Sequence, residues 1–336
     1  MRVPLRYILL RILMGVLMLL ILLTVVFFLL HILPGDPARE MLGEHALPSQ
    51  VDELRHYLGL DKPLYVQYVD FMTNMFHGNL GSSFYSGETT VNELLYALPC
   101  TMELSISALV LSVIIGLPLG MAGALKKGKV PDFVIRIFSL GSFSIPIFWL
   151  AVMLQVYVAL HTGILPIQGR NSFMLAPPRI TGFVTLDSIL TGKWSSLIDS
   201  LAHLLLPSVA ISFFYSAIIS RVSRANMIET LREDYILAAR AKGLTENKIV
   251  YKHAFRNAML PVFTIIGMQL AELIGGAIVT ETVFNLPGMG SLLMQSIFRR
   301  DYPVIQGCVA AYAISIVVVT TIVDCIYGFL DPRVSI

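Results

Sequence analysis

The chain has 336 residues, of which 56% are hydrophobic and only 14% are charged, and its mean hydropathy is +0.75. A water-soluble globule carries about 25% charged residues, so this composition excludes that class and indicates a membrane protein. The net charge of +2 leaves no concentrated basic face, so we expect no nucleic-acid partner.

Six stretches are long and apolar enough to cross a membrane as helices, which takes about 20 residues. In chain order they are Ile12–Leu30, Leu104–Leu125, Ile137–Leu160, Leu201–Ser220, Ala258–Thr280 and Val304–Val323. The fourth is the weakest, because Arg221 should cut it short. The first is longer than the apolar region of a signal peptide and no A-x-A site follows it, so we expect it to be retained.

Basic residues are unevenly distributed between these stretches. Sixteen of the 24 lysines and arginines fall in the N-terminus, the loops at 126–136 and 221–256, and the C-terminal tail. The positive-inside rule therefore predicts that both termini are cytoplasmic. The longer segments on the other side are then external.

The first external segment, 33–99, contains helix signals. Asp36 before Pro37 is typical of an N-cap followed by the first helical residue. Ser49 can open a second helix that Gly59 closes, and a third can begin after Asp61. We expect a small helical cap, and a passive spacer is the alternative.

The cytoplasmic loop at 226–258 also contains helix signals. Thr230 and Glu233 fit the capping-box pattern, which predicts that a helix begins there. Gly243 is suited to end that helix. Thr245 can cap a second helix, and the basic residues that recur on it every four positions predict a stripe along the inner leaflet: Lys248, Lys252 and Arg256.

In this loop the pair Ala238-Ala239, followed by Gly243 four residues on, resembles the EAA loop of ABC importer permeases. Leu237 stands where the family usually has glutamate. Other segments resemble the dipeptide, oligopeptide and nickel branch of that family: LLHILPGDPA (29–38), LGLDKPLYVQY (58–68), GNLGSS (78–83), LPCTMEL (98–104), ETVFNLPGMGSLL (281–293), RDYPVIQG (300–307) and FLDPRV (329–334).

This resemblance implies an all-α membrane protein with six transmembrane helices, in the type I ABC importer permease fold with a small helical external cap. It divides the chain into a cytoplasmic N-terminus with the first span (1–32), the cap (33–99), a five-helix core (100–330) and a cytoplasmic tail (331–336). The implied protein is multi-pass, lies in a prokaryotic cell membrane, and is not an enzyme.

The resemblance also implies partners. They are a second homologous permease subunit, one or two ABC ATPase subunits, an external substrate-binding protein and the lipid bilayer. ATP and magnesium would bind to the ATPases, and no cofactor to this chain. The residues expected to couple the chain to an ATPase are Glu233, Asp234, Tyr235, Ala238, Ala239, Arg240, Lys242 and Gly243.

Glu272 is the ionisable residue deepest in an apolar stretch. A carboxylate there costs about 2.5–3.5 kcal/mol on insertion scales, so it should face a cavity or a partner. We therefore expect Glu272, with the neighbouring Gly275 and Gly276, to line the substrate pathway. The alternative is a buried structural hydrogen bond. Gly116 and Gly120 could allow helices to slide, with plain packing as the alternative.

The expected function is translocation of dipeptides or oligopeptides delivered by the binding protein. Nickel, glutathione or oligosaccharides are alternative solutes for the same role. An alternative of another class is a stand-alone secondary transporter that couples to protons through Glu272. A near P-loop, Gly123 to Val130, lacks the final hydroxyl residue and does not follow a strand, so we expect no nucleotide site.

Overall fold

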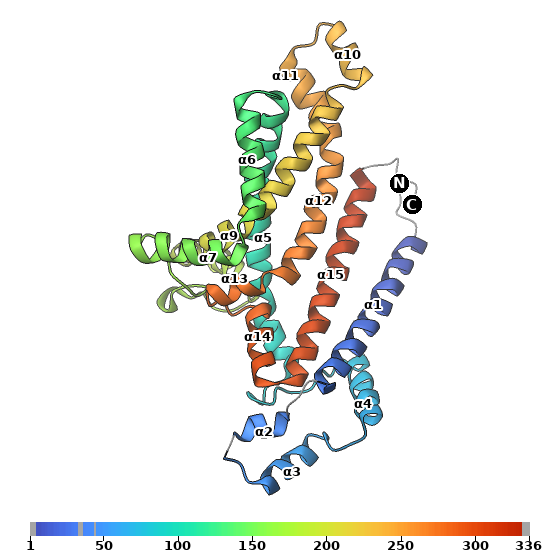
Figure 1. The fold of residues 1–336 in the computed structure, drawn as a ribbon, viewed down its shortest axis with the longest axis vertical. Helices are drawn as coiled ribbons and strands as arrows, with labels where there is room; N and C mark the ends of the chain where they lie inside the picture. The colour runs from blue at the N-terminus through green and yellow to red at the C-terminus, as the bar shows by residue number, and fades with distance from the viewer. Residues whose placement is uncertain (1–4, 33–35, 44, 331–336) are drawn as a thin grey trace.

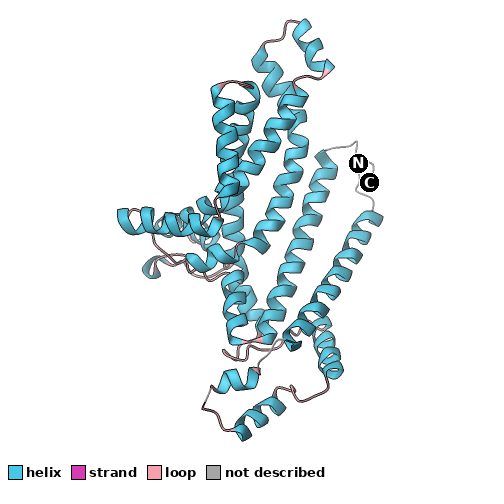
Figure 2. Ribbon diagram, in the orientation of Figure 1, coloured by secondary structure: helices cyan, strands magenta, loops and turns pink. Residues whose placement is uncertain are grey.

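The computed structural model describes residues 5–32, 36–43 and 45–330. The predicted C-terminal tail, 331–336, lies outside the described residues, as do the first four. Throughout the described ranges the chain is helical, apart from loops and an isolated bridge between Ser82 and Thr89 (Figure 2). The all-α prediction is confirmed.

Five long helices run along the length of the molecule (Figure 1). Each contains a window apolar enough to cross a membrane. They are α1 (Leu5–Ile32), α5 (Thr90–Leu125), α9 (Trp194–Thr230), α12 (Phe255–Gly276) and α15 (Tyr302–Leu330).

The third span in chain order is bent. It consists of α6 (Val130–Ser144), followed by α7 (Ile147–Leu154) and a π-helical turn, and its two halves meet at 97°. Pro146 causes the break, because a proline disfavours helical backbone at the residue before it, and Ile145 is extended (φ −93°, ψ 118°). The stretch predicted over Ile137–Leu160 is therefore present, but not as one continuous helix.

The fourth and fifth spans also differ from their predicted bounds. Helix α9 does not end at Arg221. The guanidinium lies 5.0 Å from the centre of the Phe143 ring, a favourable contact that lets the helix continue to Thr230. The fifth span ends at Gly276, and two short helices follow, α13 (Ile278–Val283) and α14 (Met289–Arg299).

Glycines bring α5 and α9 into close contact. A Cβ atom at Gly116 would lie 2.5 Å from the Ser216 carbonyl oxygen, and one at Gly120 would lie 1.8 Å from Ser223 Oγ. Nothing larger than glycine fits at either position without movement. The structure thus accounts for both glycines by packing, which is how small residues serve between membrane helices.

The segment after α1 contains the expected helices, α2 (Pro37–Leu42), α3 (Pro48–Tyr57) and α4 (Leu64–Phe76). Asp36 caps α2, because its carboxylate accepts a hydrogen bond from the Ala38 amide. Helix α4 is docked on α1, where Phe27 stacks on Phe71 at 5.5 Å between ring centres and contacts the edge of Tyr68. These contacts favour the helical cap over a passive spacer.

Candidate functional site

The coupling residues predicted from the sequence lie on and around α10 (Asp234–Ala241). Figure 1 shows α10 at one end of the molecule, with α2 and α3 at the opposite end. Glu233 is its N-cap, with extended backbone (φ −64°, ψ 147°). Asp234 occupies the first turn, where its negative charge interacts favourably with the positive end of the helix dipole. The predicted helix start at Thr230 is wrong, because α9 runs on to that residue.

Gly243 ends α10 as predicted. Its φ is +76°, and the Leu244 and Gly243 amides donate to the Ala239 and Arg240 carbonyls at 3.3 and 2.9 Å. This is a Schellman motif, in which a residue without Cβ takes the left-handed position. A Cβ at Gly243 would meet no atom within 4 Å, so only the backbone conformation requires glycine.

Helix α10 presents one face to the protein and one to its surroundings. Ile236 is fully buried and Ala239 is 9% exposed, and both belong to a cluster that includes Ile249 and Val250. The side chain of Ala239 therefore faces inward, unlike the other alanine of the pair. The outer face carries the remaining predicted coupling residues, together with Leu237: Tyr235, Ala238, Arg240 and Lys242.

Two contacts fix α10 to the following segment. The Asn257 amide donates to the Tyr235 hydroxyl at 2.8 Å, and Arg240 Nε donates to Glu246 Oε1 at 2.9 Å. The chain after Gly243 is not a separate surface helix as predicted. From Glu246 it continues through a π-helical stretch straight into α12, as one helical element 31 residues long. Helix α10 is thus joined rigidly to a membrane helix.

The predicted pathway residues lie near the end of α12. Glu272 and Gly276 are exposed, and Gly275 is half-buried. Among the described residues the Glu272 carboxylate has no hydrogen-bond partner, so the alternative of a buried structural hydrogen bond has no support. A Cβ at Gly276 would approach the Tyr215 hydroxyl to 4.0 Å. The structure does not bring Glu272 together with the coupling residues.

Glu281, which is fully buried in α13, is not among the site residues predicted from the sequence. Its Oε1 accepts from Thr101 Oγ1 at 2.6 Å, and its Oε2 accepts from the Gly290 and Ser291 amides at 2.8 and 3.1 Å. Thr101 Oγ1 in turn accepts from the Met289 amide at 2.8 Å. Glu281 and Thr101 thereby satisfy the first amides of α14, which have no partner within the helix.

Burial raises the pKa of Glu281, and the hydrogen bonds from Thr101, Ser291 and Gly290 act against it. Gly288 is required beside this carboxyl group, because a Cβ there would lie 2.4 Å from the side chain. The sequence does contain a signal for this buried site. An acidic residue stands directly after the fifth predicted apolar stretch, and a G-x-G pattern follows seven to nine positions later.

A second buried acid orders the segment between α7 and α9. Glu103 in α5 pairs with Arg170 Nη2 at 2.5 Å and accepts from the Thr185 amide and hydroxyl at 2.8 and 2.7 Å.

Asp187, a further buried acid in α8 (Val184–Leu190), accepts hydrogen bonds from Thr181 and from two neighbouring amides. Burial of Asp187 acts to raise its pKa, but these hydrogen bonds outweigh burial and lower it.

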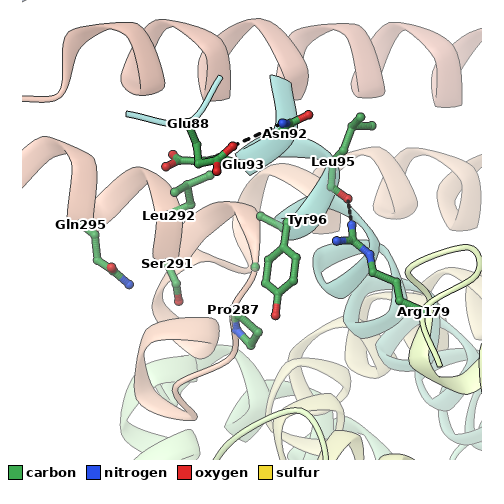
Figure 3. Close-up of a pocket in the computed structure, with 12 residues that line it drawn as sticks. Glu88, Asn92, Glu93, Leu95, Tyr96, Arg179, Pro287, Ser291, Leu292 and Gln295 are labelled. Carbon is green, nitrogen blue, oxygen red and sulfur yellow. Dashed lines mark hydrogen bonds between the residues drawn. The ribbon is translucent and has the colours of Figure 1, made fainter. Parts of the chain in front are cut away.

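A pocket of about 640 Å³ opens between the start of α5, α14 and the loop at Arg179 (Figure 3). Glu88 and Glu93 lie at one end and Arg179 at the other, with Tyr96 between them. Its volume falls within the range of about 300–1,000 Å³ that is typical of small-molecule sites.

The sequence matches two families of known proteins. Residues 116–336 match the family described as binding-protein-dependent transport system inner membrane component, and residues 4–105 match the N-terminal region of such membrane components. A di/tripeptide transport system permease protein DppB from Pseudomonas aeruginosa is 40% identical over 309 residues, 92% of each chain. The dipeptide permease DppB of Escherichia coli is also 40% identical, over 312 residues and 92% of each chain.

Solved structures share the fold at low sequence identity. A chain of the MetNI methionine ABC transporter in an inward-facing conformation superposes with a TM-score of 0.53 at 17% identity, covering 71% of this chain and 96% of that one. A chain of an amino acid ABC transporter gives a TM-score of 0.52 at 13% identity, with coverage of 71% and 94%.

Proposed function

Because the chain belongs to the family of binding-protein-dependent transport system inner membrane components, we propose that it forms one of two membrane-spanning subunits of an ATP-driven dipeptide importer. The observation that carries the proposal is the arrangement of α10. A short helix with one packed and one free face, fixed at both ends, is joined to a membrane helix at the end of the molecule away from α2–α4.

This arrangement can convert the movement of an ATPase into movement of the membrane helices. A partner that grips the outer face of α10 would move α12 with it, because α10 packs on the continuous element from Glu246 to Gly276 through Ile236 and Ala239. The movement imposed by the ATPase must favour either the inward-facing or the outward-facing state of the permease. A loosely held α10 would therefore lose the coupling between ATP hydrolysis and transport.

The partners follow from this role. One or two ABC ATPase subunits would bind ATP and magnesium and contact the outer face of α10. A second homologous permease would complete the pathway, and an external binding protein would deliver the solute. Both termini would be cytoplasmic, on the side of α10, because the positive-inside rule places the basic loops there.

The relatives named above transport dipeptides or di/tripeptides, and this supports dipeptides as the solute. Nickel, glutathione and oligosaccharides remain alternatives for the same role. A stand-alone proton-coupled transporter would need neither ATPase nor binding protein, and α10 would then serve no coupling purpose.

Affinity purification of the tagged chain from native membranes in mild detergent tests the assembly. We expect a second permease and ATPase subunits to co-purify, and the outer-face variant Leu237→Arg to lose the ATPase while keeping the second permease. A matched variant on α3, Glu53→Arg, should keep both. Recovery of the wild-type chain alone, under conditions that preserve other membrane complexes, would contradict the proposal.

A further inference from the structure

The pocket in Figure 3 has opposite charges at its two ends. The carboxylates of Glu88 and Glu93 accept hydrogen bonds only from neutral groups, Asn92 Nδ2 at 3.4 Å and Ser86 Oγ at 2.5 Å, and no described cation pairs with either. Two acids without a counter-ion beside a cavity favour a bound ammonium group, because an opposite charge stabilises both.

Arg179 lies at the other end of the pocket. It donates one hydrogen bond, from Nη2 to the Leu95 carbonyl at 3.1 Å, and its guanidinium lies 4.9 Å from the centre of the Tyr96 ring. A guanidinium has five N–H donors in a planar fork suited to a carboxylate. Most of these donors are therefore available to a ligand, and the contact with Tyr96 holds the fork in place.

The floor of the pocket is preorganised. It is formed by the start of α14, whose Gly290 and Ser291 amides are held by the buried Glu281 carboxylate. Ser291 lines the pocket and is 8% exposed, and its hydroxyl has no hydrogen-bond partner among the described residues. Because this hydroxyl oxygen is itself buried, the fixed backbone at the start of α14 is what shapes the floor.

We propose that this pocket is a binding site for the two charged ends of a zwitterionic dipeptide, with the ammonium group at Glu88 and Glu93 and the carboxylate at Arg179. The inference rests on the proposed function and extends it, because it gives the permease its own solute site, separate from Glu272. A solute with charge of only one sign, such as a metal cation, would pair with the charged residues at only one end of the pocket.

Equilibrium binding to the importer complex in lipid nanodiscs, without the binding protein, tests the site. The probe is alanyl-alanine, followed by saturation-transfer NMR, with its N-acetyl and C-amide forms as matched ligands lacking one charge. We expect the Kd of alanyl-alanine to rise about tenfold or more in Arg179→Gln and in the double variant Glu88→Gln/Glu93→Gln. Arg39→Gln and Glu53→Gln, which change exposed charges outside the pocket, should leave Kd unchanged.

The two modified peptides make the test specific. The N-acetyl peptide, which lacks the ammonium charge, should bind wild type more weakly than alanyl-alanine does, but the two peptides should bind Glu88→Gln/Glu93→Gln equally. The C-amide peptide, which lacks the carboxylate charge, should likewise bind wild type more weakly than alanyl-alanine, but the two should bind Arg179→Gln equally. Equal binding of all three peptides to wild type, or no binding by a correctly assembled complex, would overturn the site.

ATP-driven uptake separates this inference from the proposed function. Normal dipeptide uptake by the pocket variants, without measurable binding to the permease, would refute the site and leave the function intact. Pocket variants that lose affinity for the binding protein, but bind alanyl-alanine as wild type does, would show a protein-docking surface instead. Failure of the wild-type complex to transport any dipeptide would refute the function itself.

Discussion

Glu281 is the residue on which the structure around α14 depends most. Its carboxylate joins α13 to α14 and, through Thr101, to α5. A Cβ at Gly288 would lie 2.4 Å from this side chain, and a Cβ at Gly290 would lie 2.5 Å from the Ile278 Cα and 2.9 Å from Glu281 Oε2. The buried acid therefore accounts for Gly288, directly after a proline, and the close approach of α13 accounts for Gly290.

Replacing Glu281 by alanine should destabilise the protein by about 3 kcal/mol, because two amides and one hydroxyl lose their acceptor in a buried site. Glu281→Gln should cost less, since its amide oxygen can still accept from the α14 amides. Unfolding of the detergent-solubilised protein, followed by tryptophan fluorescence, measures both. Equal stability of wild type and Glu281→Ala would contradict the assignment.

The pH dependence gives a second test of Glu281. Its folded-state pKa is raised above the unfolded value, so between these values the folded protein keeps a proton that the unfolded chain has released. The contribution of this group to stability therefore falls as pH rises through that window. The unfolding free energy of wild type minus that of Glu281→Gln should decrease with pH. A flat or rising difference would refute the shift.

Gly243 should be required for coupling and not for folding. Gly243→Val forces a β-branched residue into left-handed backbone, which costs about 1–2 kcal/mol and loosens the end of α10. We expect normal insertion but loss of ATP-driven uptake, with Gly243→Asn retaining most of it. Gly128→Val is the matched control, because Gly128 has the same φ of +76° and also has open space around it. Equal uptake losses in both valine variants would argue against a specific role for α10.

Among the elements, hydropathy predicted each candidate membrane span of the described residues, because the bilayer demands long apolar stretches. It could not foresee the bend at Pro146, since a proline in a membrane helix is tolerated when neighbouring groups satisfy the freed backbone. Nor could it foresee that α9 would continue past Arg221, because the Phe143 ring that receives the guanidinium comes from a distant part of the chain.

The contact between α5 and α9 should not tolerate side chains at Gly120. Gly120→Val would place methyl groups against Ser223 and the Ser220 carbonyl, so we expect a loss of at least about 3 kcal/mol or failure to fold. Gly141→Val in α6 is the control, because a Cβ there meets no atom within 4 Å. The yield of monodisperse protein in size-exclusion chromatography compares them, and equal yields would contradict the packing.

The segment between α7 and α9 should remain ordered down to low pH. The pKa of Asp187 is lowered, so its stabilisation is complete above the ordinary aspartate value of about 3.9 and is lost only as pH falls through the folded value. Asp187→Asn should speed hydrogen exchange at Ile180–Gly182 at neutral pH, whereas Asp70→Asn on α4 should not. Unchanged exchange in Asp187→Asn would show that other contacts hold this loop.

At the scale of the whole molecule, the family, the helical class and the location of α10 could be predicted from short motifs, because those motifs encode local structure such as the Schellman end at Gly243. The pairing of Glu103 with Arg170 and the pocket between α5 and α14 could not. Both depend on residues far apart in the chain, and a single sequence gives no information on which of them meet.

In the proposed role, ATP hydrolysis by partner subunits drives dipeptide import through this chain. The most direct measurement is uptake of radiolabelled alanyl-alanine into proteoliposomes that contain the complex purified through a tag on this chain, with the binding protein added outside. Uptake should require both internal ATP and the binding protein, and Gly243→Val should abolish it. Uptake that proceeds without ATP and responds to a proton gradient would refute this role and favour a secondary transporter.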